Sequence, residues 1–230
     1  MREIALDTET TGFDPATGHR VVEIGCVEMM SRVRTGKSLQ FYLNPERDMP
    51  EEAFRVHGIA SDFLKDKPLF GEIAEKFLEF IADSPLVIHN AQFDMKFINW
   101  ELTNVGLPVL PFERAIDTVG IARRKFPGSP AKLDALCKRF NIDLSARTKH
   151  GALLDAELLA DVYLELMGGR QESMLLAAET VVSDVQQTAT TATIPHRTFE
   201  PTPEELAAHA VFLKKIKNAI WLAEQSKKAS

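Results

Sequence analysis

The strongest constraint on the fold is a change in the spacing of apolar residues near Pro50. Before that residue, three segments are rich in β-branched, aromatic and other apolar residues. These segments predict strands at 4–6, 21–27 and 39–43. After Pro50, apolar residues recur at helical spacing, interrupted by short apolar runs that predict strands at 86–88 and 115–117. Three opening strands followed by alternating helices and strands indicate an α/β domain with a mixed central sheet flanked by helices.

The helical part of the sequence predicts five helices. The first is amphipathic and ends before Pro85, with one apolar face formed by Phe70, Ile73, Phe77 and Ile81. The others are expected along the apolar positions Phe93, Phe97 and Leu102, after a cap at Asp117 or Thr118, around Leu133, Leu136 and Phe140, and from Ala152 to Met167.

Composition divides the chain into a packed domain, a linker and a tail. The domain is predicted at 1–180, with its periodic sequence ending near Gly168-Gly169. A stretch rich in Thr, Ala and Gln predicts a flexible linker at 181–199. In the tail, 200–230, Thr202-Pro203-Glu204-Glu205 has the spacing of a capping box, which predicts a helix. Its apolar face would consist of Leu206, Ala210, Leu213, Ile216 and Ile220. A single helix cannot bury such a face by itself, so we expect it to bind a partner.

Composition also excludes several classes of protein. With 45% hydrophobic residues, 12 Gly and 12 Pro among 230 residues, the chain is neither disordered nor collagen-like. Its apolar runs are far shorter than the roughly 20 residues of a membrane helix, and the acid at Asp7 comes too early for a signal peptide. The two cysteines, Cys26 and Cys137, lie in apolar segments and argue against a disulfide framework or a zinc site. We therefore expect a reduced, cytoplasmic protein with no membrane segment.

Carboxylates stand at the ends of predicted buried elements. Asp7 and Glu9 follow the first strand, and the period of two in a strand places them on the same side of the chain. Asp94 stands where a predicted strand passes into a helix, and Asp155 lies among Ala and Leu residues of another helix. Taken singly, Asp7 could belong to a turn and Asp94 could be a helix cap. Brought together, four carboxylates would repel each other unless divalent cations lay among them. Oxygen ligands favour Mg²⁺ or Mn²⁺ over zinc, and two such ions suit phosphoryl chemistry.

Three motifs contain these acids, in order along the chain. They are Asp-x-Glu-Thr-Thr-Gly from Asp7, His-Asn-Ala-x-Phe-Asp ending at Asp94, and His-x4-Asp from His150 to Asp155. In these motifs the sequence resembles the DEDDh exonucleases. The resemblance implies an RNase H-like fold and the removal of nucleotides from 3′ ends with two divalent metal ions, Mg²⁺ or Mn²⁺. It also implies that Asp7, Glu9, Asp94 and Asp155 are catalytic metal ligands and that His150 is the general base.

Sequence between the motifs resembles a narrower family, the proofreading (epsilon) subunits of bacterial DNA polymerase III. The similarity extends over roughly residues 2–180 and includes Val56-His57-Gly58-Ile59, Phe126-Pro127-Gly128 and Leu133-Asp134-Ala135-Leu136-Cys137. It implies removal of mispaired 3′-terminal nucleotides from DNA. The substrate-binding residues that it implies are Asp7, Glu9 and Asp155, with Glu52 and His57 on the terminal nucleotide and Thr10, Thr11 and Phe93 beside it. For His57, a histidine that merely ends a helix is the alternative.

The resemblance also implies partners. In the epsilon family the tail binds the polymerase catalytic (alpha) subunit, so we expect the helix within 200–230 to bind that subunit. The segment Gln171-Glu172-Ser173-Met174-Leu175-Leu176 is similar to a sliding-clamp peptide, with Gln171, Met174 and Leu176 at the key positions, although it could be the last turn of the domain. The sequence leaves open whether a small theta-like subunit binds.

Two other functions are compatible with the motifs. One is a free-standing DEDDh exonuclease that trims RNA or DNA 3′ ends, and the other is a non-catalytic module that keeps the fold as a scaffold. The complete set of acids together with His150 weighs against the scaffold. The linker and tail helix weigh against the free-standing enzyme, because such an enzyme needs no tethered helix for a partner.

One segment of the sequence, 121–150, is strongly basic. It contains eight Lys and Arg residues, among them Arg147, against two Asp residues, so its formal charge is 8 − 2 = +6. A basic segment beside an acidic, metal-binding centre would suit contacts with phosphates. A solvated helix face is the alternative for most of these residues.

Overall fold

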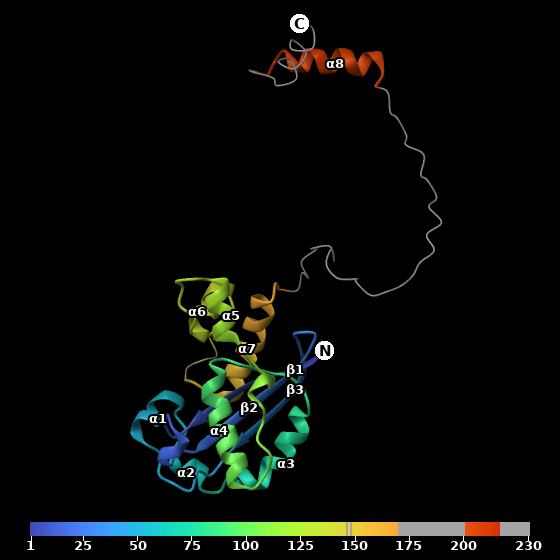
Figure 1. The fold of residues 1–230 in the computed structure, drawn as a ribbon. Coiled ribbons are helices and arrows are strands. Elements are labelled where there is room, and N and C mark those ends of the chain that lie inside the picture. The colour runs from blue at the N-terminus through green and yellow to red at the C-terminus, as the bar shows by residue number, and fades with distance from the viewer. Residues whose placement is uncertain (146, 148, 170–200, 217–230) are drawn as a thin grey trace, which may run out of the picture. The chain divides into compact units, whose positions relative to one another are not determined.

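The central element of the fold is a mixed five-stranded sheet with β1 in its middle (Figure 1). In this computed structural model, residues 1–145, 147, 149–169 and 201–216 are described. The strand order is β3-β2-β1-β4-β5; β2 and β3 run antiparallel to their neighbours, whereas β4 is parallel to both β1 and β5. The strands are β1 (Arg2–Thr10), β2 (Val21–Met30), β3 (Val33–Tyr42), β4 (Leu86–Ile88) and β5 (Ala115–Asp117). All five predicted strands are present, and the mixed sheet is confirmed.

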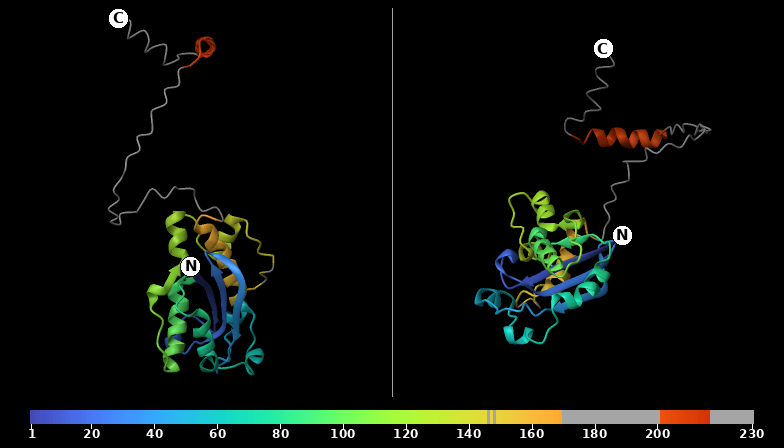
Figure 2. Two further views of the ribbon diagram at one scale, coloured as in Figure 1. Left: turned by 90° about the vertical axis from the view of Figure 1, so that its right-hand side faces the viewer. Right: turned by 60° about the horizontal axis from the view of Figure 1, so that its bottom comes forward.

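Helices cover both faces of the sheet because the central strands carry apolar side chains on both of their faces. Ile4 and Leu6 of β1 belong to one buried cluster, which also holds Phe77 and Phe97. Ala5 belongs to a second cluster on the other face. The first cluster involves α3 (Phe70–Ile81) and α4 (Ala91–Asn104), and the second involves α5 (Thr118–Lys125), α6 (Leu133–Phe140) and α7 (Ala152–Leu166). Figure 2 shows the strands running between these helices. The five helices expected from apolar spacing are therefore confirmed.

The first turn of α7 lies directly against β2. A Cβ atom added to Gly25 of β2 would lie 2.3 Å from the backbone carbon of Ala152, so only glycine allows this approach. Because α7 begins at Ala152, the contact sets how closely the start of that helix approaches β1 and β2. Asp155 is in this first helical turn, so the close approach helps to position its carboxylate.

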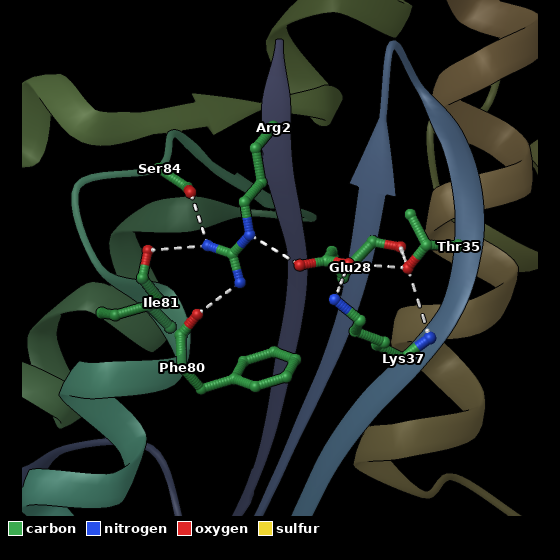
Figure 3. Close-up of polar contacts among 7 residues, drawn as sticks. All are labelled: Arg2, Glu28, Thr35, Lys37, Phe80, Ile81 and Ser84. Carbon is green, nitrogen blue, oxygen red and sulfur yellow. Dashed lines mark hydrogen bonds and ion pairs between the residues drawn. The ribbon is translucent and has the colours of Figure 1, made fainter.

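An arginine network fixes the opposite end of β1 (Figure 3). Arg2 donates hydrogen bonds to the Glu28 carboxylate of β2, to the Ser84 hydroxyl and to the Phe80 carbonyl, each at 2.7 Å. Glu28 also accepts a hydrogen bond from the Thr35 hydroxyl of β3 at 2.9 Å. One guanidinium group thus ties together β1, β2 and the connection between α3 and β4. This network lies away from the acidic end of β1 and supports the register of the sheet.

Two short helices follow β3: α1 (Glu51–His57) and α2 (Ser61–Leu64). Neither was among the predicted helices. Single turns of 3₁₀ helix occur at η1 (Pro15–Thr17) and η2 (Phe112–Arg114). In α1, His57 is the buried residue, and the helix ends at Gly58, whose φ of 74° is in the left-handed region that favours glycine. Residues of α1 line a cleft beside the end of β1.

The contacts divide the chain into two units, Met1–Ala178 and Glu179–Ser230. In the second unit, α8 (Pro203–Leu213) begins with the predicted capping box: the Thr202 hydroxyl accepts a hydrogen bond from the Glu205 N–H, and the Glu205 carboxylate accepts one from the Thr202 N–H. Exposed apolar side chains of α8 include Leu206, Val211 and Phe212. The expected linker at 181–199, the clamp-like residues Gln171, Met174 and Leu176, and Ile220 of the tail lie outside the described residues. Among the described helices, none is long and apolar enough to cross a membrane.

Candidate active site

Four elements bring the motif acids to one edge of the sheet. Asp7 and Glu9 lie near the carboxyl end of β1, and Asp94 lies in the first turn of α4, which follows β4. Because β1 and β4 are parallel, their carboxyl ends meet at the same edge. The first turn of α7 brings Asp155 there, and His150 lies in the segment just before that helix.

Among the described residues, Glu9, His150 and Asp155 form a group that could hold a metal ion. One ligand atom from each lies within 4.8 Å of the others. Asp7 lines the same cleft as His150 and Asp155, which we call the α7 cleft; its other lining residues are His89, Lys132, Leu133, Asp134 and Arg147. Asp94 is buried and accepts a hydrogen bond of 2.7 Å from the Thr8 hydroxyl.

Burial and mutual repulsion strongly perturb these acids. The pKa of Asp7 is well above its ordinary value because burial, and then the negative charges of Asp94, Glu9 and Asp155, disfavour its ionised form. The same causes raise the pKa of Glu9 to about 8, burial being the largest and Asp155 the next. Burial raises the pKa of Asp94 to about 7, despite the hydrogen bond from Thr8. Such a group of carboxylates favours either protons or a bound cation.

Asp155 differs from the other three acids because an arginine neutralises it. Arg147 donates from Nε to Asp155 Oδ1 at 2.5 Å and from Nη2 to Asp155 Oδ2 at 2.6 Å. Burial alone would raise the pKa of Asp155, but the adjacent His150 and Arg147 side chains outweigh burial and hold that pKa below its ordinary value. Asp155 is therefore a carboxylate even without a bound metal ion.

The donor set fits a divalent cation of the hard type. It consists of carboxylate oxygens from β1, α4 and α7, with one imidazole at the rim, and Mg²⁺ and Mn²⁺ prefer oxygen ligands. The high pKa values of Asp7 and Glu9 identify a place where a positive charge would remove repulsion. The ligand atoms at this edge are therefore of the type that binds the divalent metal ions expected from the resemblance to DEDDh exonucleases.

A second cleft, which we call the α1 cleft, lies between the end of β1 and α1. The five residues expected at the terminal nucleotide all line it: Thr10, Thr11, Glu52, His57 and Phe93. Glu9 lines it too, so the cleft adjoins the acids. The surface of the cleft also includes Thr8, Gly12, Phe13, His19, Pro50, Ala53 and Val56. Sequence spacing does not by itself bring α1 beside β1.

His57 has an unusual environment in the α1 cleft. The ring is buried, and its Nδ1 accepts a hydrogen bond of 3.0 Å from the Ile59 N–H. Burial lowers the pKa of His57 to about 4, so the ring is neutral near pH 7. A neutral ring that accepts at Nδ1 carries its proton on Nε2, and this Nε2 has no hydrogen-bond partner among the described residues. The Nε2 atom is itself buried.

Sequence reasoning missed several residues at this edge. Thr8 donates a hydrogen bond to Asp94 of α4. The period of two in a strand could have indicated this contact, since it places Thr8 on the face of β1 opposite Asp7 and Glu9, with Ile4 and Leu6, which pack with residues of α4. Glu23 is a fifth carboxylate, 1% exposed, and is paired in register with Glu9 across β1 and β2. Its Oε1 accepts a hydrogen bond of 2.7 Å from the Gln40 amide. No local spacing signal distinguishes it.

The fold and this edge of acids define an RNase H-like exonuclease. Solved structures support this assignment. Exonuclease X in complex with 5′ overhanging duplex DNA matches with a TM-score of 0.54 at 27% identity, over 72% of this chain and 90% of that one. The nuclease domain of 3′hExo, a DEDDh family member bound to rAMP, matches with a TM-score of 0.62 at 19% identity, over 72% and 91% of the two chains.

Sequence relatives identify a narrower group. The exonuclease family model matches residues 4–163. DNA polymerase III subunit epsilon of Rickettsia conorii is 54% identical over 222 residues, covering 94% of this chain and 96% of the relative. The subunit of the same name from Escherichia coli is 44% identical over 238 residues, covering 96% and 98%. The chain belongs to the exonuclease family and, within it, to the family of DNA polymerase III epsilon subunits.

The family assignment confirms the expected reaction. The chain is a 3′–5′ exonuclease, a phosphodiester hydrolase of a family that uses divalent metal ions, and the predicted RNase H-like fold is correct.

Proposed function

We propose that this chain removes mispaired 3′-terminal nucleotides for a bacterial replicative DNA polymerase. The observation that carries the proposal is the meeting of Asp7, Glu9 and Asp155 beside a cleft that is lined by the five residues expected at a terminal nucleotide. A 3′ end seated in the α1 cleft would place its last phosphodiester next to the acids, because Glu9 is common to the cleft and the acidic group.

In this proposal, Asp7, Glu9, Asp94 and Asp155 hold two divalent ions, Mg²⁺ or Mn²⁺. When bound, the ions supply the positive charge that brings an attacking water and a phosphodiester together and stabilises the leaving 3′ oxygen. The carboxylates contribute fixed negative charge and lie on three different elements, β1, α4 and α7. The Thr8 hydroxyl holds Asp94 at 2.7 Å, which keeps that carboxylate oriented as the site fills.

His150 is the general base in this proposal. Its side chain is about half exposed, at 47%, and its Nδ1 lies 3.2 Å from Asp155 Oδ2. A neutral imidazole at this rim can accept the proton of the attacking water as the bond to phosphorus forms.

The α1 cleft provides the contacts to the terminal nucleotide. Phe93 offers an aromatic face near the base, and Thr10 and Thr11 lie at the wall that continues from β1. The His57 ring forms part of the cleft wall, and Glu52 offers acceptors. These contacts do not read a particular base, as removal of any mispaired terminus requires.

The division of labour along the chain is the next part of the proposal. Residues 1–180 form the exonuclease domain, 181–199 form the linker, and 200–230 bind the polymerase catalytic (alpha) subunit. The exposed apolar side chains of α8, among them Phe212, which is 60% exposed, support this role. Relatives named as polymerase III subunits match 94% and 96% of this chain, so at least part of 200–230 is matched. Binding of the sliding clamp through Gln171, Met174 and Leu176, and of a theta-like subunit, are additional proposals that rest on the resemblance alone.

An experiment on DNA primers tests the reaction. The purified chain is incubated with matched and 3′-mismatched primer–templates, in Mg²⁺, in Mn²⁺ and in EDTA, with single-stranded RNA alongside. We expect release of 3′ nucleotides that is faster from mismatched ends, requires a divalent ion and is weak on RNA. Equal or faster trimming of RNA would favour the free-standing exonuclease instead, and release of nucleotides in EDTA would contradict the metal sites.

A further inference from the structure

Arg147 is a buried cation within the acidic centre. Its side chain is 7% exposed, and its guanidinium makes the bidentate contact with Asp155 described above. Nη1 also pairs with Asp134 of α6, and Nη2 lies 2.8 Å from His150 Nδ1. Arg147 was expected among the residues that contact phosphate or face the solvent. The structure instead places it against two catalytic candidates.

The acceptors used by Arg147 are those that the active enzyme needs. Both carboxylate oxygens of Asp155 accept from the guanidinium, so a metal ion bound to either oxygen would lie close to the positive charge of Arg147 and be repelled by it. His150 Nδ1 has one lone pair, and a guanidinium nitrogen can only donate to it. An N–H from Arg147 on that lone pair prevents the same nitrogen from accepting a proton from water. Arg147 therefore contacts a proposed metal ligand, Asp155, and the proposed general base, His150, at the same time.

We propose that Arg147 is an internal counter-cation that holds the metal-free centre closed and must leave Asp155 before the metal ions bind. This inference rests on the proposed roles of Asp155 and His150. In the metal-free protein, the guanidinium offsets part of the repulsion among Asp7, Glu9 and Asp155. Metal ions then replace it, freeing His150 Nδ1 in the same step. Arg147 is thus a positioning residue that couples metal binding to release of the base.

The physical consequence is competition between the guanidinium and the metal ion for Asp155. A hydrogen bond to a charged group contributes more than a neutral one, and a bidentate arginine–carboxylate pair contains two of them. Removing the guanidinium should therefore strengthen metal binding, even though it weakens the metal-free protein. If Arg147 had a purely structural role, removing its guanidinium would weaken metal binding or leave it unchanged, because a displaced Asp155 would bind the metal ion less well.

The test measures Mn²⁺ binding to the full chain by titration calorimetry, together with melting temperatures in EDTA and in saturating Mn²⁺. The variants are Arg147→Met, which removes the charge but keeps a long side chain, and Arg147→Lys, which keeps the charge but cannot form the bidentate pair. The matched control is Arg139→Met on α6, which removes a charge from the same basic segment at an exposed position.

We expect Arg147→Met to bind Mn²⁺ about 10-fold more tightly than the wild type, to melt at a lower temperature in EDTA, and to show a larger melting-temperature gain from Mn²⁺. Arg147→Lys should lie between the two, and Arg139→Met should match the wild type. If Arg147→Met does not fold, the affinity of Arg147→Lys decides. Unchanged or weaker Mn²⁺ binding by the Arg147 variants, with the wild type binding normally, would overturn this inference alone. A wild type that does not bind Mn²⁺ would overturn the proposed function as well.

Discussion

Replacing Glu9 by Gln should stabilise the metal-free protein while abolishing metal-dependent cleavage. Glu9 is 8% exposed and lies with Asp155 in the acidic group. Its pKa in the folded protein is about 8, against an ordinary value of 4.5, because burial and then Asp155 disfavour the charge. Gln has the same shape and no charge, so the change removes repulsion with little effect on packing.

The size of the effect depends on pH, and its sign follows from the raised pKa. Below pH 4.5 the carboxyl is protonated in both the folded and the unfolded chain, so it costs no stability there. As the pH rises from 4.5 towards 8, the unfolded chain ionises first and the wild type loses stability. Each pKa unit corresponds to about 1.4 kcal/mol, which sets a ceiling of roughly 4–5 kcal/mol at pH 8. Relaxation of the site reduces this, so we expect about 2–4 kcal/mol, or a melting temperature higher by about 5–10 °C.

The assay is thermal unfolding in EDTA at pH 5 and pH 8, with primer cleavage in Mn²⁺ measured alongside. Glu75→Gln is the matched control, since Glu75 is an exposed residue of α3. Glu9→Gln should exceed the wild type at pH 8, with a much smaller difference at pH 5, and Glu75→Gln should match the wild type at both. A Glu9→Gln protein that melts no higher than the wild type at pH 8 would refute the argument from repulsion, and near-normal cleavage would refute the ligand role.

Four further outcomes are expected. Asp7→Ala should abolish nucleotide release and raise the melting temperature in EDTA, because it removes a metal ligand and a repelling charge together; near-native cleavage would contradict the two-metal site. His150→Ala should lower the single-turnover rate by a factor on the order of 10²–10⁴ with little change in Mn²⁺ affinity by calorimetry, whereas an equal loss of both would make His150 a ligand. Glu101→Ala should lower the free energy of unfolding in urea by about 3–5 kcal/mol, because it removes the buried partner of Arg20, whose Nε and Nη2 each donate to it at 2.8 Å; a loss below about 1 kcal/mol would show that the pair contributes little. A chain ending at Val182 should cleave single-stranded 3′ ends like the full chain but fail to co-elute with the polymerase subunit, and a peptide of residues 199–230 should co-elute alone; the reverse behaviour would exclude binding through the tail.

Elements with strong local signals were predictable from the sequence. The helix α3 ends at Ile81, before Pro85, as apolar spacing and the proline indicate. Asp117 caps α5 by accepting from the N–H groups of Val119 and Gly120, one of the two caps considered. These features depend on residues close in the chain, so their causes are visible in the sequence.

Elements without a local signal were missed or shortened. Six of the seven residues of α1 are exposed or half-exposed, so the helix lacks an apolar stripe of helical period. The first part of β3, from Val33 to Ser38, is exposed at the edge of the sheet and carries charged and polar side chains. Its hydrogen bonds to β2 make it a strand. Pairing with a neighbouring strand, which no window of sequence contains, therefore decides the extent of β3.

The sequence by itself determined the chemistry of this protein. Its three motifs name Asp7, Glu9, Asp94, His150 and Asp155, and their places at the ends of strands and the starts of helices predict that they meet. These properties follow from residue type and local spacing, which a sequence states directly.

Only the tertiary structure decided which partner each of these residues has. Asp94 accepts from Thr8, Glu23 lies opposite Glu9, and Arg147 pairs with Asp155 rather than facing solvent. Each pairing depends on the register of β1 with β2 or on how closely α7 approaches the sheet. Since Coulombic and hydrogen-bond energies depend on distance through space, residues far apart in the chain acquire their charge states only when packing brings them together.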